Sequence, residues 1–262
     1  MGAGSAYLEA GLSPAGRSHS SPIQAAPAQV KLVALIGFVC AVVATPSMTM
    51  WPFVVQLLVL AVVAGLARLN PGRLLRGLAI EVPFVAFAFA MPFLATGERI
   101  TVAGLSVSVA GLWGAGTLLA KSTLGVLAAL ILAATTQRAE FVAGMQRLRL
   151  PSVLVEILSF MVRYLDVIAE QWHRMAIARA SRGFRARNPT SWSALSGAVG
   201  TGFIRAFERG ERVHLAMLAR GYSGALPEAI GAARAGRPVE WGWAALLVAT
   251  SLAVTSLSWG LA

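Results

Sequence analysis

Five apolar runs limit what this chain can fold into. They cover roughly residues 30–45, 50–67, 80–95, 112–134 and 241–261. A helix needs about 20 apolar residues to cross a bilayer, and the first two runs are near the lower limit of that length. Hydrophobic residues make up 57% of the 262 residues, which excludes an ordinary soluble domain. We therefore predict an all-α polytopic membrane protein with about five transmembrane helices.

Arginine divides the chain into regions. Fifteen of the 20 arginines lie between residues 137 and 238, and Arg-rich segments of membrane proteins stay in the cytoplasm. We expect a multi-pass protein of the cell (inner or plasma) membrane, with residues 137–238 and the N-terminus cytoplasmic and the C-terminus outside. The predicted division is a disordered N-terminal tail (1–28), a four-span membrane region (29–136), a cytoplasmic region (137–238) and a last transmembrane helix (239–262). The tail is rich in Gly, Ala, Ser and Pro and cannot bury an apolar core.

The third and fourth runs contain charged residues and prolines. Pro83 and Pro92 predict a kinked or broken third span. Glu81 most simply pairs with Arg73 or Arg76, and the alternative is a polar contact within a transporter. Lys121 is expected between helices or reaching toward the interface. Residues 96–109 are typical of an external loop that can hold a short strand pair.

Two long helices are expected in the cytoplasmic region. The first covers residues 151–182 and has an apolar stripe with alternating spacings of four and three, formed by Leu154, Leu158, Met161, Leu165, Ile168, Trp172 and Met175. The second opens near Ser191 or Ser193. Both close on Arg-Gly-aromatic, at Arg182-Gly183-Phe184 and at Arg220-Gly221-Tyr222. Glycine there is the favoured left-handed cap, and a cation in the last turn suits the negative end of the helix dipole.

This pair of endings resembles the transmembrane (T) component of energy-coupling factor (ECF) transporters, the CbiQ/EcfT family, and is closest to the cobalt-importer branch. The matching stretches are Arg163 to Asp166, Arg179 to Phe184, Glu208 to Val213 and Ala216 to Tyr222. Ser181 departs from the alanine that the family usually has, but it is still small. The resemblance implies long cytoplasmic coupling helices inserted before the last span.

The resemblance also implies partners and site residues. Two ABC-type ATPase subunits (CbiO- or EcfA-like) would each receive one helix tip, and a substrate-binding membrane subunit (CbiM- or S-component-like) would release its ligand inward, with lipid around the spans. The implied coupling residues are Ala180, Ser181, Arg182, Gly183, Ala219, Arg220 and Gly221, supported by Arg179, Glu208, Arg212 and Tyr222. The chain would be a non-catalytic subunit, with ATP hydrolysis in its partners and cobalt as the transported ion.

Other functions remain as alternatives. The chain could be a T component for biotin or other vitamins, an independent secondary transporter, or a membrane-embedded enzyme. The last would need convergent acidic or histidine residues, and Glu81 alone is insufficient. The three histidines have no metal-ligand spacing, so we expect no catalytic residues, no metal site and no cofactor. The excess of basic residues is not accompanied by aromatic residues arranged to stack on bases, so we do not expect nucleic-acid binding.

Overall fold

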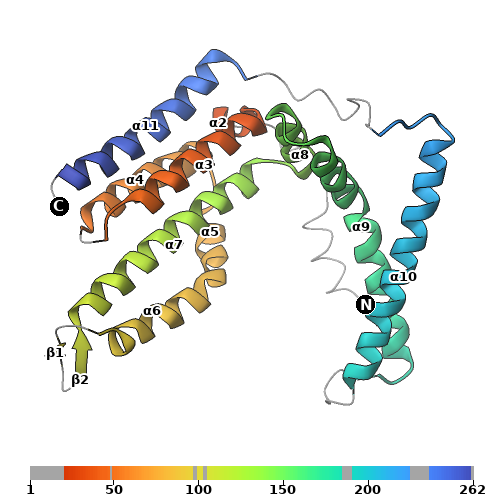
Figure 1. Ribbon diagram of the computed structural model, residues 1–262, viewed down its shortest axis with the longest axis horizontal. Helices are drawn as coiled ribbons and strands as arrows, with labels where there is room; N and C mark the ends of the chain where they lie inside the picture. The colour runs from red at the N-terminus through yellow and green to blue at the C-terminus, as the bar shows by residue number, and fades with distance from the viewer. Residues whose placement is uncertain are drawn as a thin grey trace. The chain divides into compact units, whose positions relative to one another are not determined.

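The structure is a computed structural model that describes residues 21–47, 49–96, 99–102, 105–184, 191–224 and 236–260. Helices dominate it (Figure 1), and the prediction of an all-α polytopic membrane protein is confirmed. Its contacts form two compact units. The first joins Met1–Gln137 to Arg234–Ala262, and the second is Arg138–Ala233. Residues 1–20 of the predicted tail, the link at 185–190 and the loop at 225–235 lie outside the described residues.

Apolar helices of the first unit correspond to all five predicted runs. They are α3 (Ala28–Ala44), α4 (Trp51–Leu66), the segment Pro71–Leu94, α7 (Val109–Thr135) and α11 (Pro238–Gly260). The last three are long and apolar enough to cross a membrane, whereas α3 and α4 have 17 and 16 residues. A short helix, α2 (Pro22–Ala25), precedes them and is capped by the Ser21 side chain.

The third segment is broken near Pro83, as predicted, whereas Pro92 lies inside a continuous helix. It consists of α5 (Pro71–Gly77), the 3-10 turn η1 (Leu78–Glu81) and α6 (Val82–Leu94). Pro83 lies in the first turn of α6, where its missing N–H removes no helical hydrogen bond. The break therefore lies at the one place where a proline can begin a new helix at little cost.

The first unit is held together by a small apolar core. Its buried members come from three helices: Phe38 and Val42 of α3, Phe53 and Leu60 of α4, and Leu124, Ala128 and Ile131 of α7. Helix α11 lies beside α3 (Figure 1). The two approach closely at Gly37, because a Cβ there would lie 2.7 Å from Val248 Cγ2. Small residues allow this kind of approach between apolar helices.

Hydroxyl and amide groups link α3, α4 and α11 inside this unit. Gln56 is fully buried, and its Nε2 donates to Thr45 Oγ1 at 3.2 Å and to Thr255 Oγ1 at 3.4 Å. Thr255 in turn donates to the Ala41 carbonyl at 3.0 Å. Such links are favoured away from water, because an unpaired polar group there is costly.

The loop between α6 and α7 contains the predicted strand pair. Strands β1 (Arg99–Val102) and β2 (Leu105–Ser108) are antiparallel, with Arg99 opposite Ser108. Ser108 then caps α7 by accepting a hydrogen bond from the Gly111 N–H.

The second unit contains three helices, α8 (Arg138–Arg147), α9 (Ser152–Ser181) and α10 (Ser191–Leu218). Helix α8 packs on α9. Arg138 also reaches Asp166 of α9, with 3.4 Å between Nη1 and Oδ1. This ion pair is solvent-exposed and contributes little to stability.

Packing of α6 on α7 predicts a selective effect of adding one methyl group. A Cβ on Gly111 would lie 2.8 Å from the Met91 carbonyl oxygen and 2.8 Å from Pro92 Cα, both backbone atoms that cannot move aside. We expect Gly111→Ala to destabilise the protein by about 1–3 kcal/mol through overpacking. Gly125→Ala is the matched control in the same helix, since nothing lies within 4 Å of its Cβ. Thermal unfolding in detergent should show a lower midpoint only for Gly111→Ala.

Candidate functional site

The C-terminal ends of α9 and α10 are built by the same backbone motif. At the end of α9, the Gly183 N–H donates to the Ala180 carbonyl at 3.0 Å, and the Phe184 N–H donates to the Arg179 carbonyl at 3.1 Å. Gly183 has φ +75°, in the left-handed region. These two nested hydrogen bonds and the left-handed residue define a Schellman cap, in which Arg182 is the last half-helical residue.

Helix α10 ends in the same way. The Gly221 N–H donates to the Leu218 carbonyl at 3.0 Å, and the Tyr222 N–H donates to the Met217 carbonyl at 3.0 Å. Gly221 has φ +84°. Arg220 therefore occupies the same position in its cap as Arg182 does, and the glycine caps predicted at both ends are confirmed.

Both cap arginines are exposed at the helix ends. Each lies beside the last backbone carbonyls, where the helix dipole is negative and a cation is favoured. Their small neighbours Ala180, Ser181 and Ala219 are exposed too. Ser181 satisfies its own hydroxyl by donating to the Ala178 carbonyl at 3.0 Å. Each tip thus has an exposed arginine that directly follows small, exposed residues.

The aromatic residue after each glycine folds back onto the protein. At the first tip the Arg179 guanidinium lies over the Phe184 ring, 5.9 Å from its centroid. At the second tip, Tyr222 lies edge-on to His214 and donates its hydroxyl to Glu156 Oε2 at 2.7 Å. That hydrogen bond, the loss of some surrounding water and the nearby negative charge raise the pKa of the Tyr222 hydroxyl.

Helices α9 and α10 run antiparallel (Figure 1). Tyr222 meets Glu156 near the start of α9, and Arg209 Nη2 meets Gln171 Oε1 at 3.3 Å in its middle. Further along α9, the ring of Trp172 lies 3.1 Å from where a Cβ of Gly202 would be. The two arginine tips therefore lie at opposite ends of the pair. About 26 residues of α9 separate them, or roughly 40 Å at 1.5 Å per residue.

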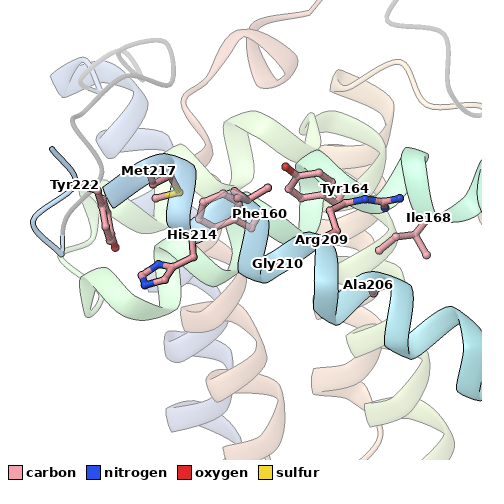
Figure 2. Close-up of a pocket in the computed structure, with 10 residues that line it drawn as sticks. Phe160, Tyr164, Ile168, Ala206, Arg209, Gly210, His214, Met217 and Tyr222 are labelled. Carbon is pink, nitrogen blue, oxygen red and sulfur yellow. The ribbon is translucent and has the colours of Figure 1, made fainter. Parts of the chain in front are cut away.

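A largely apolar cavity of about 300 Å³ lies between the two helices (Figure 2). Residues from both sides line it, including Phe160, Tyr164 and Ile168 of α9 and His214 and Met217 of α10. Tyr222, which follows the cap of α10, also lines it.

Only part of the predicted apolar stripe of α9 packs against α10. Trp172 and Met175 contact the region of Gly202, whereas Met161 and Leu165 are exposed at 59% and 50%. Large apolar side chains of α10 are exposed as well, among them Phe203 at 70% and Phe207 at 59%. The pair therefore has apolar surface that contacts within its own unit do not cover.

Two ion pairs lie on the surfaces of α9 and α10. Arg174 lies 3.6 Å from Glu170, and Arg212 lies 3.9 Å from Glu208, each one turn apart. All four side chains are more than half exposed, so these pairs contribute little. Glu208 and Arg212 lie on α10, within its last three turns.

The partners of the charged residues in the first unit differ in part from the prediction. Glu81 is buried and accepts hydrogen bonds from the Ser122 and Thr123 hydroxyls of α7, so the prediction of Arg73 or Arg76 as its partner is wrong. Lys121 lies between helices, as expected, and donates to the Val43 carbonyl at 2.8 Å. Among the described residues, no three of the types His, Cys, Asp and Glu lie close enough together to hold a metal ion.

Comparison with known proteins identifies related sequences. The profile of the CbiQ family, described as "Cobalt transport protein", matches residues 19–229. An uncharacterized protein of Methanocaldococcus jannaschii is 33% identical over 100 residues, which are 38% of this chain and 37% of that protein. A protein of Methanocorpusculum labreanum, provisionally named as a fused cobalt transport protein CbiMQ, is 25% identical over 80% of this chain and 36% of its own length.

The cobalt transport protein CbiQ of Rhodobacter capsulatus is 24% identical over 155 residues, which are 56% of this chain and 64% of that protein. The chain thus spans between about one third and two thirds of the length of these three relatives.

The two caps predict that their glycines are needed for conformation alone. Nothing lies within 4 Å of a Cβ at Gly183 or Gly221, so a substituted residue would meet no clash. An L-residue held in the left-handed region costs roughly 1–2 kcal/mol, and Asn tolerates that region best. We expect Gly183→Val and Gly221→Val to loosen the last turn, and the Asn variants to retain it. Hydrogen exchange of the Phe184 and Tyr222 amides should quicken only in the Val variants, and equal protection in all four would contradict this.

Proposed function

Because the chain belongs to the CbiQ family of cobalt transport proteins, we propose that it is the coupling subunit of an ECF-type importer. In this role it passes a conformational change from two ATPases to a substrate-binding membrane protein. The observation that supports this most directly is the pair of identically capped arginine tips at opposite ends of α9 and α10. Two ATPase subunits that close together require two such attachment points.

Each tip suits insertion into an acidic groove. A guanidinium presents a planar fork of donors that matches a carboxylate, and lysine cannot reproduce this geometry. The Schellman cap holds Arg182 and Arg220 at the helix ends. A partner that binds the arginine is therefore coupled to the whole helix. Movement of the groove then becomes movement of the helix. ATP binding and hydrolysis belong to the partner ATPases, and this chain needs no catalytic residue of its own.

The transported ion in this proposal is cobalt, and the substrate-binding partner is a CbiM-like membrane protein. The name of the fused CbiMQ relative supports such a pairing. The uncovered apolar side chains of α9 and α10 are suited to contact a membrane subunit as well as lipid. A T component for biotin or another vitamin would share this geometry, because the ligand pocket lies in the partner.

The arginine distribution supports an orientation in the cell membrane. We propose that Arg138–Ala233 and the N-terminus are cytoplasmic and that the β1–β2 hairpin is outside. The ATPases then meet the helix tips in the compartment that contains ATP.

Charge reversal at both tips tests the function. We expect Arg182→Glu combined with Arg220→Glu to abolish ATP-dependent cobalt uptake and ATPase association, while the chain still inserts. Loss of one partner of a desolvated charge pair costs roughly 2–5 kcal/mol, or more than tenfold in affinity. Arg205→Glu is the matched control, because Arg205 is an exposed arginine in the middle of α10.

The measurements are cobalt uptake into vesicles and recovery of ATPases with the tagged chain, both normalised to chain in the membrane. Normal uptake by the double variant would refute the role of the tips. ATP-dependent uptake of biotin in place of cobalt would leave the coupling role intact and correct the substrate.

Cysteine accessibility tests the orientation. In a Cys40→Ala background, which removes the one native cysteine, we introduce Thr96→Cys or Ser223→Cys at exposed positions. A membrane-impermeant maleimide added to intact cells should label position 96 and not position 223. Permeabilised cells, in which both positions should react, provide the control. The reverse pattern would invert the proposed topology.

A further inference from the structure

The second tip is joined to a residue far away in the sequence. The Tyr222 hydroxyl donates to Glu156 Oε2 at 2.7 Å, across 66 residues of chain. The Tyr222 backbone N–H simultaneously completes the α10 cap through the Met217 carbonyl. One residue therefore holds the backbone that positions Arg220 and also binds the neighbouring helix.

The first tip has no equivalent link among the described residues. Phe184 has no hydroxyl, and its ring lies against the guanidinium of Arg179, five residues earlier in the sequence. The two endings are thus alike in backbone but different in how they are held. Arg182 moves with the end of α9, whereas Arg220 is connected to the opposite end of α9 as well as to α10.

Glu156 lies near the start of α9, where the antiparallel pair of α9 and α10 follows α8 in the chain. It is in the second turn of α9, next to Val155, the one residue of α9 that is buried. Helix α8 packs on α9, and a solvent-exposed ion pair joins Arg138 of α8 to Asp166, which lies further along α9 than Glu156. Because α8 begins at Arg138, directly after the end of α7 at Thr135, this region is continuous with a membrane span.

We propose that Tyr222 and Glu156 are positioning residues that clasp the Arg220 tip to the start of α9, so that displacement of this tip is passed to α8 and α7. This relay rests on the proposed coupling function and gives the two tips different tasks. The Arg182 tip moves the far end of α9. The Arg220 tip moves the near end, through one hydrogen bond to a carboxylate.

The chemistry of the clasp suits a persistent contact. A hydrogen bond to a charged acceptor is stronger than one between neutral groups. The neutral hydroxyl is the donor, and its pKa is raised by Glu156, so it stays protonated at physiological pH. The Tyr222 ring is also packed edge-on against His214 beside the cavity (Figure 2), which limits the positions of the hydroxyl.

The first test removes the hydroxyl while retaining the ring. In the complex reconstituted with its ATPases, we expect Tyr222→Phe to lower cobalt uptake per ATP hydrolysed by roughly tenfold, the factor that corresponds to one hydrogen bond to a charged group. The ratio is measured on assembled complexes, so that it reports the relay and not the amount of ATPase bound. Tyr164→Phe is the matched control in the same cavity, since no hydrogen bond of its hydroxyl is found among the described residues.

Glu156→Gln is the second variant and tests the acceptor. It should lower the same ratio, because the amide oxygen of Gln accepts a weaker hydrogen bond from Tyr222 than a carboxylate does. The combined variant should be no worse than Tyr222→Phe alone, since both act on the same contact. A spectroscopic readout does not depend on transport. With Tyr7 and Tyr164 changed to Phe, Tyr222 is the sole tyrosine of the chain. Its ultraviolet titration midpoint in the full-length detergent-solubilised chain should fall when Glu156 becomes Gln.

The outcomes separate the relay from the function on which it rests. Three outcomes would each overturn the relay alone. They are unchanged uptake per ATP in both single variants, additive losses in the double variant, and a Tyr222 titration midpoint that does not change when Glu156 is replaced. Absence of ATPases from the wild-type preparation would overturn the proposed function, and the relay with it.

Discussion

A glycine in the left-handed conformation, directly after an arginine, decides where each part of the candidate site lies. At Gly183 and Gly221 the chain ends the helix with two nested hydrogen bonds. Glycine permits this because it has no Cβ that would clash at positive φ. The arginine before it is then held in the last turn, and the aromatic residue after it is turned back toward the helix. A helix end without such a cap would fray, and the position of the guanidinium would not be defined.

The membrane unit is held by different means from the hairpin of α9 and α10. Its helices approach closely at small residues such as Gly37 and Gly111, and a buried amide at Gln56 bonds to hydroxyls of two other helices. Van der Waals packing and a few hydrogen bonds are what hold helices together in lipid, where no hydrophobic force acts between them. Helices α9 and α10 instead keep much of their apolar surface uncovered within their own unit. That contrast fits the proposed role, in which α9 and α10 contact partner proteins.

Local features of the chain could be predicted from sequence, and long-range contacts could not. The apolar runs, the break before Pro83, the strand pair and both glycine caps each depend on residues within a few positions of one another. The partner of Glu81 depends instead on how the third segment lies against α7, and hydroxyls replaced the expected arginine. Glu156 was missed for the same reason. Nothing in the sequence links an acidic residue early in a helix to a tyrosine 66 positions later. The aromatic residue after each capping glycine was the one signal that could have drawn attention to Phe184 and Tyr222.

The different attachment of the two tips follows from the antiparallel arrangement itself. In an antiparallel pair, the C-terminal end of α10 necessarily lies beside the start of α9, where the chain arrives from α8. The C-terminal end of α9 lies at the other end, roughly 40 Å from that entry point. In the proposed function, equal movements of the two tips would therefore act over very different lengths of α9. A side-chain link at the near tip shortens the path there, while the far tip acts through the length of α9. The two caps have the same backbone structure but lie at different distances from the start of α9. The residue after each glycine, Phe184 or Tyr222, is where the sequences of the two tips differ accordingly.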